Sequence, residues 1–333
     1  MFISVQGNYY YSIVNNIRVS IIIFLILFEN HFYKNYNFCS RCVSLPSNNI
    51  RCSECPLEYI FKGLNIVSKE KTLDEIIYNH KSIARFGDGE YRIIFGKNAF
   101  FQKYNKTLAK KLYDVLNCKE KNLLIGINIP WRKKEFEERS NASKRMWENF
   151  FHQYKINISN IINKNKKYYS STISRFYSTF KDRTNILKFI QKLKKIWDKR
   201  DVLIIEGEQT RFGIGNDLLN NTKSIKRIIC PVCDAFNSYN QILKSALKFD
   251  KSVLILIALG PTASVLAYDL YKFNYQVIDV GHIDIQYEFF LRKVEHSIKI
   301  PYKYTSEARG GSVNITNITD INYYNQIKYK IYN

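Results

Sequence analysis

Glycines and carboxylates follow four predicted strands of this sequence. The strands are expected at 82–86, 202–206, 253–259 and 276–280. The residues after them are, in that order, Gly87-Asp88-Gly89-Glu90, Gly207-Glu208, Gly260-Pro261-Thr262 and Gly281-His282-Ile283-Asp284. Glycine and acidic residues are common in ordinary turns, so one such turn indicates little. Parallel strands end at one edge of a sheet, where ligands bind, and the four turns together predict a ligand site at that edge.

Asp88 and Glu90 have the spacing and chemistry of a divalent-cation site. They stand two residues apart around a glycine, and carboxylate oxygens are the ligands that Mg²⁺ and Mn²⁺ prefer. A cation there would neutralise charge on a departing diphosphate. We expect mutual repulsion to raise the pKa of one of the two carboxyls. The pattern alone is weak, because an acidic pair at this spacing often occurs by chance.

Gly260-Pro261-Thr262 precedes a predicted helix at 262–273. A glycine turn at a helix N-terminus presents N–H groups that bind phosphate, and we expect this turn to face the same cleft as Asp88. Thr262 is also a natural N-cap, so a purely structural role is the alternative. The turn matches neither a Walker A loop nor the GxGxxG fingerprint, which weighs against a dinucleotide oxidoreductase.

Further polar residues near the strand ends are candidates for substrate contacts. Glu206 and Glu208 follow or end a strand, and either is a candidate to orient a sugar or act as a base. Arg211 has the guanidinium needed for bidentate phosphate binding. Asn216 and Asp217 can instead be an ordinary helix cap.

The last predicted strand carries three more candidates. Asp279 lies within it and is a candidate ribose ligand. His282 and Asp284 follow it and have the residue types of a general base and the group that orients it. A single histidine in a turn is often structural, so both interpretations of His282 remain open.

Strands and helices alternate along residues 59–298. Besides the four strands above, short apolar runs predict strands at 123–127 and 225–229. Helical spacing appears at 71–80, with a cap near Thr72, and at 106–116, 140–154, 185–198, 237–249 and 262–273. This alternation predicts an α/β fold: a Rossmann-like, mostly parallel sheet with helices on both faces.

Residues 1–58 differ in composition from the rest of the chain. The run Val19 to Phe28 is apolar for ten residues, whereas a membrane-spanning helix needs roughly 20. A buried or interfacial segment, a poor membrane anchor and a misplaced start site are the three interpretations. We therefore expect an N-terminal segment at 1–58, one domain at 59–298 and a C-terminal tail at 299–333.

Two CxxC pairs lie in the N-terminal segment. Four thiolates at such spacing are typical of a structural zinc site, so we expect one Zn²⁺ at these positions, with incidental cysteines and disulfides as the alternatives. The pairs are Cys39 with Cys42 and Cys52 with Cys55. The total of seven cysteines is odd, which argues against a fully oxidised framework. A third pair, Cys230 and Cys233, follows a predicted strand and suits packing or a metal or redox role.

The formal charge of the chain is +22. Basic proteins often bind nucleic acid, anionic membranes or phosphorylated ligands. Here the lysines are scattered, and no nucleic-acid recognition motif accompanies them. We expect a solvated basic surface, with peripheral membrane contact as the alternative and no specific nucleic-acid partner.

Several of these segments together resemble bacterial glycosyltransferases of the GT-D fold. The resemblance spans about residues 64–295 and keeps the order and spacing of the motifs. The segments are RFGDGE at 85–90, DVLIIEGEQTRFGIGNDLL at 201–219, SIKRIICP at 224–231, LIALGPTASVLAYDL at 256–270 and QVIDVGHIDIQYEFF at 276–290. One departure is conservative: Phe290 stands where tryptophan is more usual. Residues 1–58 lie outside the resemblance.

The resemblance implies transfer of a hexose from a UDP-sugar to a glycan or glycoprotein acceptor. It also implies that Asp88 and Glu90 hold a divalent metal, typically Mn²⁺, or alternatively Mg²⁺. By the same resemblance Arg85, and with it Gly87, would lie against the donor diphosphate. We expect a cytoplasmic location, with membrane association through the N-terminal segment as the alternative.

Two other functions compete with this one. The first is a non-catalytic module that binds a membrane or nucleic acid through the basic surface and the CxxC pairs. The second is another Rossmann-type enzyme, such as a methyltransferase or dehydrogenase. The intact acidic pair at Asp88 and Glu90 favours the glycosyltransferase, and the missing fingerprint glycines argue against a dehydrogenase.

Overall fold

The computed structural model describes residues 57–306, 308–311 and 315–332. The chain divides into two units, residues 1–60 and residues 61–333. In the first unit the structure describes only the short helix α3 (Leu57–Ile60). The CxxC pairs at Cys39, Cys42, Cys52 and Cys55 and the apolar run at 19–28 lie outside the described residues, so the expectations for zinc and for membrane contact stay predictions.

The second unit is built on a parallel sheet. Its described strands run in the order β1-β4-β3-β2-β8-β7-β5-β6-β9, and every described pairing is parallel. The strands are β1 (Asn65–Ile66), β2 (Ser82–Phe86), β3 (Leu123–Ile127), β4 (Lys167–Ser170), β5 (Asp201–Gly207), β6 (Ser224–Cys230), β7 (Leu254–Ala258), β8 (Gln276–Asp279) and β9 (Ile327–Lys330). The six predicted strands and the α/β fold class are confirmed.

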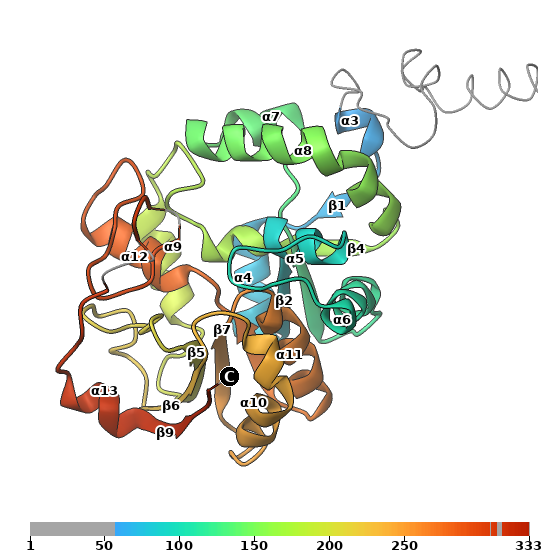
Figure 1. Cartoon of the computed structure of the whole chain (residues 1–333). Helices are drawn as coiled ribbons and strands as arrows, with labels where there is room; N and C mark the ends of the chain where they lie inside the picture. The colour runs from blue at the N-terminus through green and yellow to red at the C-terminus, as the bar shows by residue number, and fades with distance from the viewer. Residues whose placement is uncertain (1–56, 307, 312–314, 333) are drawn as a thin grey trace, which may run out of the picture. The chain divides into compact units, whose positions relative to one another are not determined.

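Helices cover both faces of this sheet. Alternate strand residues such as Ile204, Leu256 and Ile278 pack in one core cluster with helices α4, α9 and α12. The intervening residues are buried as well, and α11 packs against β2, β7 and β8 on that side, with α6 and α10 beside it. Because both faces are buried, the central strands are apolar throughout rather than alternating. Figure 1 shows α10 and α11 side by side, well apart from α7 and α8.

Of the helices that the structure describes in this unit, six lie at the expected positions, though not all have the expected ends, and four more, at 88–94, 133–137, 283–291 and 321–326, were not predicted. They are α4 (Lys69–Tyr78), α5 (Asp88–Ile94), α6 (Lys106–Asn117), α7 (Lys133–Glu137), α8 (Asn141–Ile161), α9 (Ile186–Lys194), α10 (Tyr239–Ala246), α11 (Pro261–Lys272), α12 (Ile283–Leu291) and α13 (Ile321–Gln326). The expected cap at Thr72 was wrong. Ser68 caps α4 by accepting from the N–H of Lys71, and the hydroxyl of Thr72 donates to the Ser68 carbonyl from inside the first turn.

Residues 299–333, expected to form a tail, contribute to the domain. β9 pairs with β6 at the edge of the sheet, and the side chain of Lys303 is fully buried. The strand has only four residues with alternating exposure, so its short pattern gave no strong sequence signal. In the described part of the chain, no helix combines the length and the apolar character needed to cross a bilayer.

Candidate active site

A cleft of about 540 Å³ lies at the carboxyl edge of the sheet. Residues at or just after the ends of seven of the strands line it: Gly87, Asn128, Ser171, Gly207, Pro231, Gly260 and Gly281. β2 lies between β3 and β8 in the sheet. The chain forms β3 and β4 on one side of β2, and the strands from β5 onward lie on the other side. The cleft therefore lies at the topological switch point, where α/β sheets bind ligands. The structure brings together the four turns singled out in the sequence.

Asp88 and Glu90 both line this cleft, but they belong to the first turn of helix α5 rather than to a loop. Gly87 is the N-cap of that helix. The Oε2 atom of Glu90 accepts from the Gly87 N–H at 2.7 Å, which closes the helix start. The Asp88 side chain is 46% exposed and its nearest cation is the Arg92 Nε, 3.9 Å away. Negative charge at a helix N-terminus is favourable, which helps to hold both acids here.

Burial raises the pKa of the Glu90 carboxyl to about 7, with the nearby Asp279 adding to the increase. The expectation that one carboxyl of the pair has a raised pKa is met by Glu90, but the main cause is burial. Repulsion between the two predicted ligands is not the main cause. The protonated form of Glu90 is therefore favoured in the folded protein relative to an exposed glutamate.

Glu90→Gln is expected to remove a pH dependence of stability. An exposed glutamate ionises near pH 4.5 and folded Glu90 near pH 7, so the folded state binds more protons between these values. The wild-type protein should then lose stability as pH rises from about 4.5 to 7, by up to about 3 kcal/mol. Urea unfolding at pH 5 and pH 8 measures this loss, and the variant should lack that part of it. An equal loss of stability in the wild type and in Glu90→Gln would contradict the raised pKa of Glu90.

Arg85 and Asp279 line the cleft and form an ion pair with each other. The Nη2 atom of Arg85 donates to Asp279 Oδ1 at 2.7 Å, and its Nε donates to the Asp279 carbonyl at 2.7 Å. Its Nη1 contacts the Ser174 hydroxyl. Every nitrogen of the guanidinium thus has a protein partner, and the pair joins β2 to β8. Both residues line the cleft as expected, but these bonds already use most of their hydrogen-bonding capacity.

Gly281 is required by this pair. Its φ is +45°, and a Cβ at this position would overlap the Arg85 guanidinium. A side chain there would therefore break the contact between Arg85 and Asp279. The glycine thus has a packing reason in addition to its place in a turn.

The turn at Gly260 faces the cleft only in part. Gly260 is the N-cap of α11 and Pro261 its first residue, and both line the cleft together with Asp88. Thr262 is fully buried, is not the N-cap, and its hydroxyl donates to the Gln102 side chain at 3.3 Å. Pro261 has no N–H, and the Ala263 N–H donates to the Gly260 carbonyl at 2.9 Å. The turn therefore offers fewer backbone donors to a phosphate than its sequence indicates.

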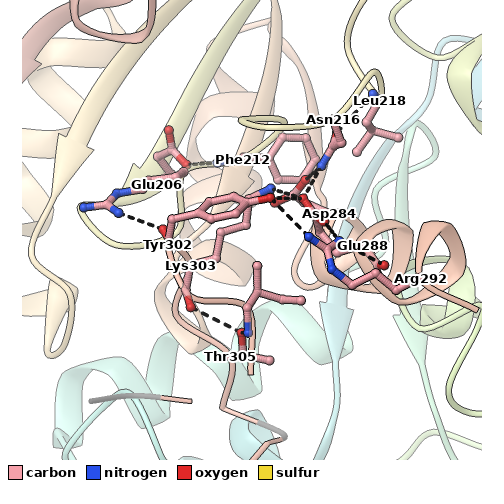
Figure 2. Close-up of polar contacts among 12 residues, drawn as sticks. Glu206, Phe212, Asn216, Leu218, Asp284, Glu288, Arg292, Tyr302, Lys303 and Thr305 are labelled. Atoms are coloured by element: carbon pink, nitrogen blue, oxygen red, sulfur yellow. Dashed lines mark hydrogen bonds and ion pairs between the residues drawn. The ribbon is translucent and has the colours of Figure 1, made fainter. Parts of the chain in front are cut away.

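His282 and Asp284 line the cleft, but their environments differ. His282 is the N-cap of α12, and its ring lies 6.2 Å from that of Phe101. Asp284 is buried, and its Oδ2 accepts from the Nζ of Lys303 at 2.6 Å. The same ammonium lies 3.0 Å from Glu288 Oε1, so one lysine pairs with two buried carboxylates, and Arg292 pairs with Glu288 as well. Figure 2 shows this arrangement.

The segment at 211–217 supports this buried network and not a phosphate site. The Nδ2 atom of Asn216 donates to Asp284 at 2.9 Å and to Glu288 at 2.8 Å. Arg211 is buried, and its Nη1 donates to the carbonyls of Tyr302 and Thr316. Arg211 is not among the cleft-lining residues, because its guanidinium holds the C-terminal segment in place.

Glu206 and Glu208 also lie away from the ligand space. Glu206 is fully buried in an ion pair with Arg227. Glu208 is exposed, and the cleft is lined by its neighbours Gly207 and Gln209 rather than by Glu208 itself. Of the three predicted catalytic side chains, His282 is therefore the one that lines the cleft without being held in the buried ion network.

Cys230 ends β6 and Cys233 follows it, and neither is in a disulfide. Cys230 is buried and its pKa is raised by burial, whereas Cys233 is exposed. A buried thiol with a raised pKa is a poor nucleophile and metal ligand. This environment agrees with the packing interpretation for Cys230, whereas the exposed Cys233 does not pack in the core.

Sequence reasoning missed several cleft residues. Asn128 follows β3, so the strand-end rule applied to that strand would have identified it. Phe101 and Tyr304 also line the cleft, with ring centroids 5.1 Å apart. They come from a loop after α5 and from the C-terminal segment, and no local pattern connects them. Ser143 and Trp147 of α8 line the cleft as well.

Asp88 and Glu90 line the same cleft and stay the candidate ligands for a divalent cation that would take further ligands from a bound molecule. Both are hard oxygen donors, and Glu90 keeps its Oε1 atom outside the bond to Gly87. Within the described residues, no cluster of three or more His, Cys, Asp or Glu side chains can hold a metal. Two carboxylates alone leave most positions around such a cation to water or ligand oxygens, as is usual for Mg²⁺ at phosphate sites.

The fold and the cleft define an α/β enzyme domain of the Rossmann-like class, with its ligand site at the switch point of a parallel sheet. A family model described as "Glycosyltransferase GT-D fold" matches residues 83–308. The chain belongs to this family of glycosyltransferases.

Known relatives support the same assignment. The chain is 34% identical over 281 residues to glycosyltransferase GlyD of Streptococcus pneumoniae, covering 84% of this chain and 34% of that protein. It is 35% identical over 247 residues to a probable glycosyl transferase Gly of Streptococcus gordonii, covering 74% of this chain and 36% of that protein. The chain thus spans about a third of the length of these curated relatives.

Solved structures share the fold. One, described as the highly conserved domain of unknown function 1792 with a distinct glycosyltransferase fold, has a TM-score of 0.79 and 33% identity, covering 84% of this chain and all of that chain. A second, described as a new glycosyltransferase from Streptococcus sanguinis, has a TM-score of 0.77 and 32% identity, covering 80% of this chain and 99% of that chain.

Proposed function

We propose that this chain transfers a hexose from a UDP-sugar to a glycan or glycoprotein acceptor, using a divalent cation held by Asp88 and Glu90. The observation that supports this most is the position of the two carboxylates, which line the cleft at the switch point of a GT-D fold sheet. Carboxylates at such a place suit a ligand that carries a diphosphate and a cation.

The roles of the residues follow from their contacts. Asp88 and Glu90 would hold Mn²⁺ or Mg²⁺, which neutralises charge on the leaving diphosphate when bound. Arg85 and Asp279 form an ion pair that lines the cleft, and Gly260 lines the cleft as well. His282 is our candidate for the base that accepts the proton of the acceptor hydroxyl. Asp284 is assigned a positioning role because Lys303 and Asn216 hold its carboxylate.

A donor screen tests this proposal. The full chain is incubated with UDP-glucose, UDP-galactose, UDP-N-acetylglucosamine and, as controls, ADP-glucose and GDP-mannose, each with Mn²⁺ or with excess EDTA. Slow release of the nucleoside diphosphate to water reports donor use without a known acceptor. We expect release from at least one UDP-sugar, only with the metal. Release from no donor, together with no binding of UDP, would favour the non-catalytic module.

A further inference from the structure

Arg139 is a buried cation without an anionic partner. It is 5% exposed, and among the described residues no carboxylate lies within ion-pairing distance of it. Its guanidinium lies instead near two aromatic rings, those of Trp147 and Phe180. Burial lowers the pKa of Arg139 to about 10, and the charge of Glu135, which lies beyond ion-pairing distance, opposes this decrease, so Arg139 stays charged at neutral pH. A buried charge is normally paired, because an unpaired one is costly.

The hydrogen bonds of Arg139 lead to the cleft. Its Nη2 donates to Asn128 Oδ1 at 2.6 Å and its Nη1 donates to Ser143 Oγ at 3.2 Å. Asn128 and Ser143 both line the cleft. Arginine can only donate, so the amide oxygen of Asn128 must face it and the NH₂ group is the part left for another partner. The hydroxyl of Ser143, which accepts from Arg139, likewise has its own hydrogen to donate.

Two further buried donors, on Trp147 and on Arg139 itself, have no acceptor. Trp147 lines the cleft and is 1% exposed, and its indole N–H has no hydrogen-bond partner. The Nε–H of Arg139 has none either. Buried donors are almost always satisfied in folded proteins. Several unsatisfied donors beside a buried positive charge indicate a ligand that supplies acceptor oxygens and negative charge.

We propose that Asn128, Ser143 and Trp147, with Arg139 behind them, form a subsite for an anionic oxygen group such as a phosphate or a carboxylate. The subsite includes Asn128, which comes directly after β3. β3 pairs with β2, and Asp88 comes two residues after the end of β2. The proposal rests on the proposed function for the identity of the ligand. The group belongs either to the diphosphate of the donor or to an acidic group of the acceptor, and both have the same recognition chemistry.

Asn128→Asp is the sharpest variant. It preserves the size of the side chain and gives Arg139 the carboxylate partner that it lacks, so the fold should be as stable as the wild type or more so. The same change cancels the positive charge and removes an amide donor, so the affinity for inorganic phosphate should fall roughly 10- to 100-fold. Arg139→Gln should weaken phosphate binding as well. Arg145→Gln is the matched control, because Arg145 is an exposed arginine on helix α8, which begins two residues after Arg139.

Phosphate binding to the full-length chain is measured by titration calorimetry, first with the free protein and then with UDP and Mn²⁺ at saturation. If UDP abolishes phosphate binding and Asn128→Asp weakens UDP but not uridine, the anion is the donor diphosphate. If phosphate still binds beside UDP, the anion belongs to the acceptor. Wild type that does not bind phosphate, or Asn128→Asp that binds it as wild type does, overturns the subsite. Phosphate binding that depends on Asn128 without any UDP binding would retain the subsite and refute the proposed donor.

Discussion

Replacing Asp88 with asparagine is expected to lower metal-dependent donor turnover by a factor on the order of 10³ while the fold stays intact. The substitution preserves the shape of the side chain and removes one negative ligand from the proposed cation site. Asp88 is half exposed and only loosely paired with Arg92, at 3.9 Å, so little stability depends on its charge. The loss should therefore appear in the rate and in the metal dependence, not in thermal unfolding.

The measurement is UDP release over a Mn²⁺ titration, with thermal unfolding recorded on the same samples. Asp114→Asn is the control, because Asp114 is an exposed helical acid that pairs with a lysine. The control should behave as wild type at every metal concentration. Equal rates for Asp88→Asn and wild type would show that the acidic pair serves only to start helix α5.

Replacing Lys303 with methionine is expected to lower the free energy of unfolding by about 3–5 kcal/mol, because it leaves the buried Asp284 carboxylate without its cation and leaves Glu288 with Arg292 alone. Lys303 is fully buried and lies 2.6 Å from Asp284 and 3.0 Å from Glu288. Methionine fills a similar volume, so the loss reflects charge and not a cavity. The same residue anchors the segment that carries Tyr304 to the cleft, so donor turnover should fall as well.

Urea unfolding at pH 7 measures this effect. Lys110→Met, at an exposed site, is the control and should change stability by less than about 0.5 kcal/mol. Adding Asp284→Asn to the Lys303→Met variant removes the unpaired Asp284 charge and should recover part of the lost stability. A Lys303→Met protein as stable as wild type would show that the buried ion network contributes little.

The central strands were predictable because burial on both faces leaves an unbroken apolar run. The predictions at 82–86 and 123–127 match β2 and β3 residue for residue. Those for β5, β6 and β7 differ from the strands by one residue at each end, and that for β8 by one residue at its C-terminal end. The strands β1, β4 and β9 were missed because they have two to four residues and lie near the edges of the sheet. Such short strands are defined by their partners and not by their own pattern.

The cleft was predictable to the extent that it follows from topology. Parallel strands end at one edge, and the residues after β2, β7 and β8 do meet there. The side-chain directions were not predictable from the same rule. Glu208 points outward and Arg211 inward to the C-terminal segment, and each lies only one to four residues beyond β5.

Long-range partners account for the rest of what the sequence did not reveal. Asp284 was expected to act in catalysis because it follows a strand. Its partner Lys303 lies 19 residues away in a segment without a regular pattern, so its buried ion network was not visible in the sequence. Arg139 was overlooked for the same reason: only the fold shows that it is buried without an anion and bonded to two residues of the cleft.

Direct binding of Mn²⁺ tests the central claim most simply. Free Mn²⁺ is followed by electron paramagnetic resonance while the full chain is added, with and without UDP. We expect about one Mn²⁺ bound per chain in the presence of UDP, weaker binding without it, and none at the same concentrations for Asp88→Asn. Wild-type protein that binds no Mn²⁺ with UDP, or that turns over its donor fully in excess EDTA, would contradict the account.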